Sequence, residues 1–280
     1  GLELIKIGYD SRTGQLDLFQ LRKELGEDVA GVYVENPSYL GFLETHVDEV
    51  AKAAHEAGAL FVVGVNPISL GLLRAPGDYG ADIVIGEGQP LGNPVSFGGP
   101  LLGIFACRDE VKLVRQMPGR LIGMTTALDG KTRGYVMVLQ TREQHIRRER
   151  ATSSICSNEA LCGVAAAIYL ASLGPRGLRE LGEACAANAN YAMRKLRAIK
   201  GLKVPIFDAP HFNEFTLNCD DIGMSVAKLN AELLKRDIQG GKPLRGEFPE
   251  LGETSLMCVT ELHSKEDIDR LVSAIAEIAG

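Results

Sequence analysis

The stretch YGADIVIGEGQPLGNPVSFGGPLLGIF, from Tyr79 to Phe105, decides the fold class. Its apolar segment Ile83 to Ile85 is typical of a buried strand and runs into a loop rich in glycine and proline. A second apolar segment, Leu101 to Cys107, predicts another strand after the loop. Glycine lets a backbone approach a ligand closely or adopt positive φ, so this loop has the composition of a ligand site. The stretch nevertheless contains no Lys, His or Cys that could do chemistry.

Short apolar segments alternate with helical patterns before this stretch. Buried strands are predicted over Leu2 to Tyr9, Val29 to Glu35 and Ala59 to Val65. Apolar residues at helical spacing predict helices over Leu16 to Leu25 and from Val47 to Ala57. All-apolar strands are buried on both faces in parallel sheets that helices cover. The sequence therefore predicts a doubly wound α/β layer with a mainly parallel sheet.

The pattern changes after Cys107. Asp129-Gly130 is a strong hairpin signal between the predicted strands Leu121 to Leu128 and Tyr135 to Gln140. Thr141 to Arg150 is predicted to be a charged helix, with Glu and Arg at a favourable i,i+4 spacing.

Two long helices are predicted next, from Glu159 to Leu173 and from Arg176 to Ile199, with Gly174-Pro175 between them. Strand and helix patterns then predict a smaller α+β unit, whose last helix starts at a capping-box-like Ser264 to Asp267. We therefore expect three parts: residues 1–140 in a large α/β domain, 141–200 in linking helices, and 201–280 in a small C-terminal α+β domain.

The composition excludes several classes of function. A net charge of −6 gives no electrostatic basis for binding nucleic acid or an anionic membrane. No run of about 18 apolar residues is present, so no transmembrane helix is expected. The six cysteines form no C-x-x-C pair, and the histidines have no H-x-x-x-H spacing. The sequence therefore predicts reduced thiols, mostly buried, and no metal site.

The N-terminal sequence GLELIKIG lacks the layout of a signal peptide, which favours a cytoplasmic location. The first residue is Gly and a core strand is expected from Leu2 onward. We therefore expect a fragment, or a chain processed from a longer one, that lacks an N-terminal part. A remnant of a purification tag would also leave Gly1.

Three longer segments resemble a known family. They are AHEAGALFVVGVNPISLGLLRAPGDYGADIVIGEGQPLG (Ala54 to Gly92), GGPLLGIFA (Gly98 to Ala106) and TREQHIRRERATSSICSNEAL (Thr141 to Leu161). The chain resembles glycine decarboxylase, the P-protein of the glycine cleavage system, and within it subunit 1 of the two-subunit bacterial form. The resemblance covers Leu2 to Ala279. It implies the fold of the fold-type I enzymes that depend on pyridoxal phosphate (PLP).

Two positions depart from the pattern of the catalytic sister subunit. The family's subunit 2 has an Asp that pairs with the pyridine nitrogen of PLP. Aligning the segments through Pro76-Gly77-Asp78 puts Val63 at this position. Subunit 2 also has a Lys that forms the Schiff base, and aligning through Gly98-Gly99-Pro100 puts Gln89 there. Gln cannot form an imine and Val cannot stabilise a pyridinium, so the resemblance implies that this chain binds no PLP covalently.

Other residues are candidates for a residual pocket or for an interface. Asn36, in Glu35-Asn36-Pro37-Ser38, follows a predicted strand at the edge where α/β sheets bind ligands, although a plain turn is the alternative. A run of basic side chains begins in the hairpin and continues after it. Such side chains suit carboxylates or phosphates, or else form a solvated helix face; they are Arg133, Arg142, His145, Arg147 and Arg148. Thr152 and Asn158 precede a helix, where they could bind an anion or simply cap it.

The resemblance implies a non-catalytic subunit of glycine dehydrogenase (decarboxylating), in a cytoplasmic heterotetramer. Its partners would be subunit 2, which carries PLP, and the lipoylated H-protein, and the holoenzyme would decarboxylate glycine. One alternative is an independent PLP enzyme that uses a non-standard Lys such as Lys131, in the loop DGKTRG. Another alternative is a structural or regulatory binding module. The sequence predicts no catalytic residue and no metal ligand in this chain itself.

Overall fold

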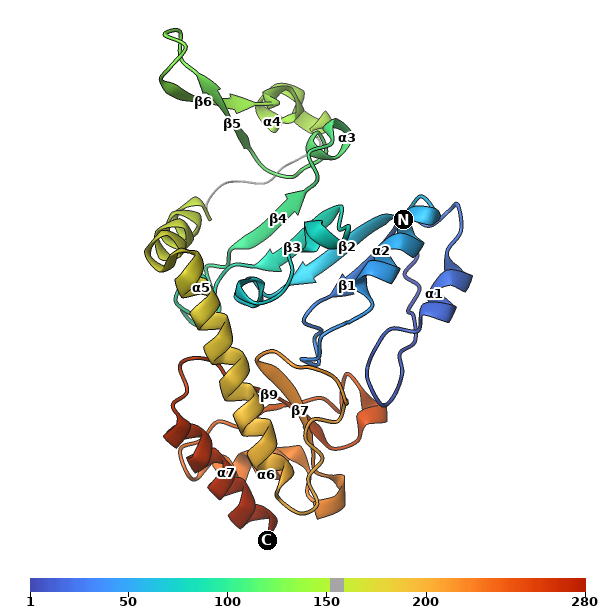
Figure 1. Ribbon diagram of the computed structural model, residues 1–280, viewed down its shortest axis with the longest axis vertical. Helices are drawn as coiled ribbons and strands as arrows, with labels where there is room; N and C mark the ends of the chain where they lie inside the picture. The colour runs from blue at the N-terminus through green and yellow to red at the C-terminus, as the bar shows by residue number, and fades with distance from the viewer. Residues whose placement is uncertain (152–158) are drawn as a thin grey trace.

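The computed structural model describes residues 1–151 and 159–280. Figure 1 shows a four-stranded sheet in the middle of the molecule, a two-stranded hairpin beyond one edge of it, and a second sheet near the C-terminus. The long helix α5 (Ala160–Arg197) runs along the molecule from the hairpin side to the C-terminal sheet. The division into residues 1–140, 141–200 and 201–280 stays a prediction.

The four-stranded sheet has the order β1-β2-β3-β4. Its strands are β1 (Gly31–Glu35), β2 (Leu60–Val65), β3 (Ile83–Glu87) and β4 (Gly103–Cys107). β1, β2 and β3 pair in parallel, whereas β4 runs antiparallel to β3. The strands predicted on both sides of the glycine-rich loop are thus neighbours, and the mainly parallel sheet is confirmed.

One face of this sheet is covered by α2 (Val47–Glu56), which packs against α1 (Leu18–Glu24). Val50 and Ala54 of α2 are completely buried in one cluster with Phe61 and Val63 of β2. Burial along β1 alternates, and Tyr33 on the opposite face is 52% exposed. The open face of β1 differs from the expectation that strands here are buried on both sides, and it leaves room for a cavity.

The predicted N-terminal strand is wrong. Residues Leu2 to Gly8 have no strand structure, and Tyr9 forms only an isolated bridge with Leu16. Leu2 and Leu4 are 91% and 84% exposed. A buried strand requires a neighbour to receive its backbone hydrogen bonds, and no strand within residues 1–151 and 159–280 pairs with this segment. Apolar composition alone therefore misled the prediction.

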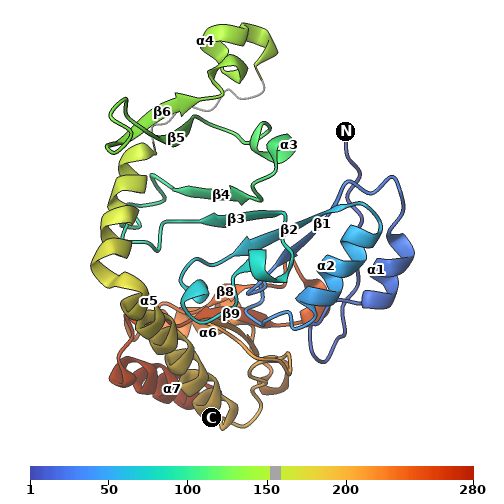
Figure 2. The same cartoon turned by 45° about the horizontal axis from the view of Figure 1, so that its top comes forward.

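The predicted hairpin is confirmed. β5 (Leu121–Thr126) pairs antiparallel with β6 (Arg133–Val138), and Gly130 in the turn has φ of 68°. Figure 2 shows the hairpin beyond β4, on the side of the sheet away from β1. The short helix α3 (Val111–Val114) connects β4 to the hairpin.

The helix predicted over Thr141 to Arg150 is much shorter. α4 covers only Gln144–Arg147, and short 3₁₀ turns flank it. Leu139 and Arg148 have φ of 55° and 52°, and an L-residue with positive φ cannot continue a right-handed helix. The charged segment is therefore a series of turns.

The break predicted at Gly174-Pro175 is confirmed inside α5. Gly174 has φ of 63° and ψ of 179°, and this non-helical residue divides α5 into two pieces. By length and composition α5 could cross a membrane, and 11% of its apolar window is buried. Its first piece, Ala160 to Leu173, spans about 21 Å at about 1.5 Å per residue, against a hydrocarbon core of about 30 Å. Composition is therefore weak evidence for a membrane span.

The C-terminal unit is a three-stranded antiparallel sheet of order β7-β9-β8 with two helices. The strands are β7 (Glu214–Asn218), β8 (Lys242–Pro243) and β9 (Thr254–Cys258), and the helices are α6 (Val226–Leu234) and α7 (Lys265–Ala279). The capping box is confirmed: the Ser264 hydroxyl accepts from the Asp267 backbone N–H, and the Asp267 carboxylate accepts from the Ser264 backbone N–H. The remaining 3₁₀ helices are Ser69–Gly71, Pro76–Tyr79, Asp220–Ile222 and Pro249–Leu251.

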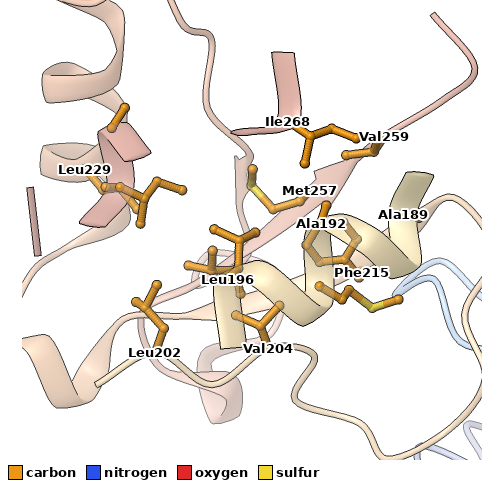
Figure 3. Close-up of a cluster of buried hydrophobic side chains, with 14 of the residues drawn as sticks. Ala189, Ala192, Leu196, Leu202, Val204, Phe215, Leu229, Met257, Val259 and Ile268 are labelled. Carbon is orange, nitrogen blue, oxygen red and sulfur yellow. The ribbon is translucent and has the colours of Figure 1, made fainter. Parts of the chain in front are cut away.

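The largest buried cluster lies between the second half of α5 and the C-terminal sheet. Figure 3 shows Ala192 and Leu196 of α5 together with Phe215 of β7 and Met257 of β9. Leu196 and Phe215 are completely buried. Burying such side chains contributes about 1.5–3 kcal/mol each, so this core fixes the C-terminal sheet to α5.

Candidate functional site

A cavity of about 440 Å³ lies at the carboxyl ends of β1, β2 and β3. Parallel strands bring these ends to one edge of the sheet, where open α/β folds place their ligands. One wall comes from the C-terminal unit, because Glu214 begins β7. The cavity is lined by Tyr33, Glu35, Pro37, Ser38, Tyr39, Gly64, Val65, Asn66, Pro67, Ile85, Gly86, Glu87, Pro90 and Glu214.

Two glycines make the floor of the cavity. A Cβ atom added at Gly64 would lie 2.5 Å from the Tyr33 hydroxyl oxygen. A Cβ atom at Gly86 would lie 2.8 Å from the Val65 carbonyl oxygen. Glycine at position 64 therefore allows the Tyr33 side chain to lie across the neighbouring strand.

The walls are acidic. Glu35, Glu87 and Glu214 line the cavity, and its lining within the described residues includes no Lys, Arg or His. The Tyr33 hydroxyl donates to the Glu35 carboxylate at 3.0 Å. Burial, together with the charge of Glu35, raises the pKa of Tyr33 to about 12, so the phenol stays protonated. Glu87 is held in place because one of its oxygens accepts from the Gln89 and Leu102 backbone N–H groups, both at 2.9 Å.

Glu214 is half-buried, and solvent reaches its carboxylate oxygens. Burial and the nearby charge of Glu35 raise its pKa above the ordinary value for Glu. The buried Glu44 accepts from two backbone N–H groups, and Asp82 is bonded to a backbone N–H and to His55. The Glu214 carboxylate has no hydrogen-bond or ion-pair partner within the described residues.

Tyr39 lines the cavity and is held by the C-terminal unit. Its hydroxyl donates to the Glu247 carboxylate at 2.9 Å and accepts from the Lys242 ammonium at 2.5 Å. Lys242 and Glu247 also form an ion pair at 2.7 Å. The Tyr39 ring stacks on Phe248, with ring centres 5.9 Å apart. The sheet edge and the C-terminal unit thus both contribute to the walls of the cavity.

Val63 and Gln89 do not line this cavity. Val63 is completely buried on the α2 side of the sheet, and its neighbours Gly64 and Val65 reach the cavity. The Gln89 amide donates to the Asn93 carbonyl oxygen at 2.5 Å, which holds the turn after β3. Both residues contribute to the structure: Val63 packs the core and Gln89 closes a turn.

Asn36 lies between cavity-lining residues, but its own amide is engaged elsewhere. Its side chain donates to the Glu44 carbonyl oxygen at 3.3 Å and accepts from the Glu44 backbone N–H at 3.2 Å. Asn36 therefore fixes the loop that brings Glu35, Pro37 and Ser38 to the cavity.

The basic segment divides into one buried arginine and several exposed side chains. The Arg142 guanidinium is buried and donates to the carbonyl oxygens of Met117 and Gly119, the latter at 2.6 Å. It therefore joins the turns after β6 to the loop before β5. The exposed members of the candidate set are Arg133, His145, Arg147 and Arg148.

The remaining candidates lie away from the cavity. Lys131 is exposed at the hairpin tip, where its backbone N–H donates to Asp129 at 2.9 Å. Thr152 and Asn158 lie outside the described residues. The described residues also contain no group of three His, Cys, Asp or Glu side chains that could hold a metal ion.

Sequence reasoning placed Glu35-Asn36-Pro37-Ser38 and the glycine-rich loop at the strand ends, with Asn36 as the candidate, but it gave no role to Tyr33, Tyr39 and Glu214. Tyr33 could have been predicted from the sequence. The side chains of alternate strand residues share one face, so Tyr33 lies on the same face of β1 as Glu35. Glu214 comes from the other end of the chain, and no local pattern in the sequence indicates its place.

The sheet topology and the long connecting helix define the class of the fold. A sphingosine-1-phosphate lyase from Burkholderia pseudomallei K96243 has a similar structure, with a TM-score of 0.66 at 16% identity over 97% of this chain and 56% of the lyase. Likeness at this identity concerns the fold alone. The fold is that of the fold-type I PLP-dependent transferases.

Comparisons at higher sequence identity also show the family. The glycine cleavage system P-protein family matches residues 9–275, and the chain belongs to this family. A probable glycine dehydrogenase (decarboxylating) subunit 1 from Thermococcus onnurineus (strain NA1) is 52% identical over 100% of this chain and 60% of the relative. A glycine decarboxylase (P-protein) in inhibitor-bound form has a TM-score of 0.88 at 39% identity over 99% of this chain and 60% of that protein. The chain thus spans about 60% of the length of these relatives.

Gly41 brings the two walls of the cavity together, and we expect Gly41→Ala to destabilise the protein by about 2–4 kcal/mol. Gly41 has φ of 89°, and an added Cβ atom would lie 2.0 Å from the Glu214 carbonyl oxygen. Urea denaturation measures the loss. Gly77→Ala is the matched control, because Gly77 has no atoms within 4 Å of the added Cβ and no positive φ. Equal stabilities of the two variants would contradict this account of the contact.

Proposed function

We propose that this chain acts as subunit 1 of glycine dehydrogenase (decarboxylating) and is a non-catalytic partner of the subunit that carries PLP. Membership of the P-protein family and the names of the relatives support the assignment to the glycine cleavage system. The observation that carries the non-catalytic role is the loop after β3. It has Gln89 at the aligned Schiff-base position, and no lysine lies between Tyr79 and Phe105.

The electrostatics of the cavity support the same proposal. PLP has a phosphate group with a negative charge, which proteins hold with backbone N–H groups at helix N-termini or with Arg and Lys. The cavity is lined by three carboxylates and, among the described residues, by no cationic side chain. The residues present do not fit PLP, so we assign the cofactor to the partner subunit and assign no chemical step to this chain.

The proposed role is to complete the assembled enzyme. We propose that the holoenzyme, a cytoplasmic heterotetramer, decarboxylates glycine and transfers the aminomethyl group to the lipoylated H-protein. This chain would contribute buried area to the assembly and shape the approach to the active site of subunit 2. Residues 1–140, 141–200 and 201–280 are proposed to act as large domain, linking helices and small domain.

A surface of exposed apolar side chains is the proposed contact with subunit 2. It consists of Val95, Phe97 and Leu101 in the loop before β4, and Leu161 and Ile168 on the first piece of α5. The loop packs on the helix, because the Asn93 amide donates to the Cys162 carbonyl oxygen at 3.3 Å. Phe97 and Leu161 are 110% and 77% exposed, and exposed apolar patches of this kind mark interaction sites.

Co-purification with subunit 2 tests the proposed partnership. We expect the full-length chain to form a stable complex, and Leu161→Asp to weaken it by about tenfold or more, because a charge would enter an apolar contact. Leu234→Asp is the matched control, since Leu234 is 67% exposed on α6 and lies outside the proposed contact. Analytical ultracentrifugation gives the two dissociation constants. A complex that Leu161→Asp leaves unchanged would place the contact elsewhere, and the lack of any complex would overturn the proposal.

A further inference from the structure

A short segment before β7, residues 208–212, connects the C-terminal unit to the loop between β1 and α2, and we call it the strap. The Leu43 backbone N–H of that loop donates to the Pro210 carbonyl oxygen of the strap at 2.8 Å. The next strap residue, His211, forms an isolated antiparallel bridge with Phe42. His211 therefore lies at the point where the strap is bonded to the loop.

The ring of His211 is buried in its neutral form. The residue is 6% exposed, and Nδ1 lies 2.8 Å from the Ala209 carbonyl oxygen. A carbonyl oxygen can only accept a hydrogen bond, so Nδ1 carries the proton and donates it. Nε2 is buried and has no hydrogen-bond partner within the described residues. The lone pair of Nε2 is therefore the place where a further proton would bind, and no acceptor for that proton lies beside it.

The charged groups around the strap do not compensate a positive charge on this ring. Arg197, at the end of α5, acts on the ring, and burial together with the charge of Arg197 lowers the pKa of His211. No carboxylate among the described residues bonds to the ring; those of the adjoining segments are Glu44 in the facing loop, Asp208 in the strap and Glu214 in β7. The other titratable or charged groups of these segments are Arg12, which pairs with Asp208, and His46, which pairs with Glu44.

We propose that the strap is an acid-sensitive connection, which is closed while His211 is neutral and opens when His211 takes up a proton at Nε2. In the closed strap the protonated ring would be a buried charge without a partner, and such a charge is costly. Opening exposes the ring to water, which solvates the imidazolium. The inference goes beyond the proposed function and does not depend on it.

The direction of the pH dependence follows from the two states of the strap. The ordinary pKa of histidine is about 6.5, and the pKa of His211 is lower in the closed strap. Between these two values the open strap binds more protons, so the equilibrium constant for opening rises as the pH falls below about 6.5. It levels off below the lowered pKa of the closed strap. From about pH 7.5 to about pH 5.5 the constant can rise by at most about tenfold, and we expect a rise of about threefold or more.

Hydrogen exchange of the full-length chain, corrected for the intrinsic exchange rate at each pH, measures this opening constant. The amides of Leu43 and Phe212 report on the strap, because both donate to carbonyl oxygens across it. The Ile268 amide, which is bonded within α7, is the internal control. We expect the opening constant to rise at Leu43 and Phe212 and to stay unchanged at Ile268.

Two variants identify the group that titrates. His211→Gln keeps a neutral donor for the Ala209 carbonyl oxygen and has no group that titrates near pH 6. We therefore expect the pH dependence at Leu43 to be lost in this variant. His46→Gln is the matched control, because the His46 side chain belongs to the same region and is 40% exposed. It should leave the pH dependence at Leu43 as it is.

Nuclear magnetic resonance of the histidine rings in the unmodified chain keeps the test valid if His211→Gln does not fold. We expect the neutral His211 ring to carry its proton on Nδ1 and to titrate below the ordinary pKa of about 6.5. A His211 ring that titrates at or above that value would overturn the inference. An equal rise of the opening constant at Ile268, or a pH dependence at Leu43 that His211→Gln leaves unchanged, would also overturn it.

Discussion

Pyridoxal phosphate added to this chain is expected to give no imine absorption band and, after borohydride reduction, no labelled lysine. A Schiff base needs a lysine whose amine reaches the aldehyde while other groups hold the phosphate. The aligned residue is Gln89, whose amide is bonded to the Asn93 carbonyl oxygen, and the cavity lining among the described residues has no cation. Absorption spectra followed by peptide mass analysis measure the outcome.

The same experiment separates the two enzyme hypotheses. Subunit 2 is the positive control, for which the proposal predicts a trapped PLP adduct. Lys131 is the proposed alternative nucleophile, but it is exposed at the hairpin tip. An adduct on this chain that is lost in Lys131→Ala and kept in Lys112→Ala, another exposed lysine, would favour the independent enzyme.

Phe215→Ala is expected to lower the free energy of unfolding by about 3–5 kcal/mol, the usual cost of truncating a buried Phe. Phe215 is completely buried where β7 meets α5, in one cluster with Leu196 and Met257. The change removes contacts on both sides and leaves a cavity between the sheet and the helix. Since Glu214 precedes Phe215, the cavity wall that Glu214 forms also loses its support.

Urea denaturation followed by far-UV circular dichroism measures this loss. Leu234→Ala is the matched control, because Leu234 is 67% exposed and its truncation should change the stability by less than about 0.5 kcal/mol. A loss below about 1 kcal/mol in Phe215→Ala would contradict the view that this cluster fixes the C-terminal unit.

Most elements of the fold were predictable from sequence because their signals are local. The parallel strands have apolar runs, the hairpin has Asp129-Gly130, and the last helix has its capping box. The errors arose where structure depends on distant partners. The segment Leu2 to Gly8 has the composition of a strand, but no strand among the described residues pairs with it. The segment after β6 has a helical charge pattern, but positive φ at Leu139 and Arg148 breaks it.

The site was predictable in part, for the same reason. The sequence indicates the glycine-rich edge of the sheet and the turn from Glu35 to Ser38, but the candidate in that turn, Asn36, bonds to the Glu44 backbone instead of lining the cavity. The closing residues Tyr39 and Glu214 depend on the C-terminal unit, which contacts the sheet edge only in the folded chain. For Arg142 the sequence suggested a role that the structure does not show. Its charge suggests an interface, but its guanidinium donates to two carbonyl groups inside the chain.

Glycine–bicarbonate exchange, assayed with lipoylated H-protein, tests the central claim most directly. The assay compares full-length subunit 1, subunit 2 loaded with PLP, and the mixture of both. The account predicts no exchange by this chain alone and exchange by the mixture well above that of subunit 2 alone. Exchange by this chain without subunit 2, or full activity of subunit 2 that this chain does not increase, would contradict it.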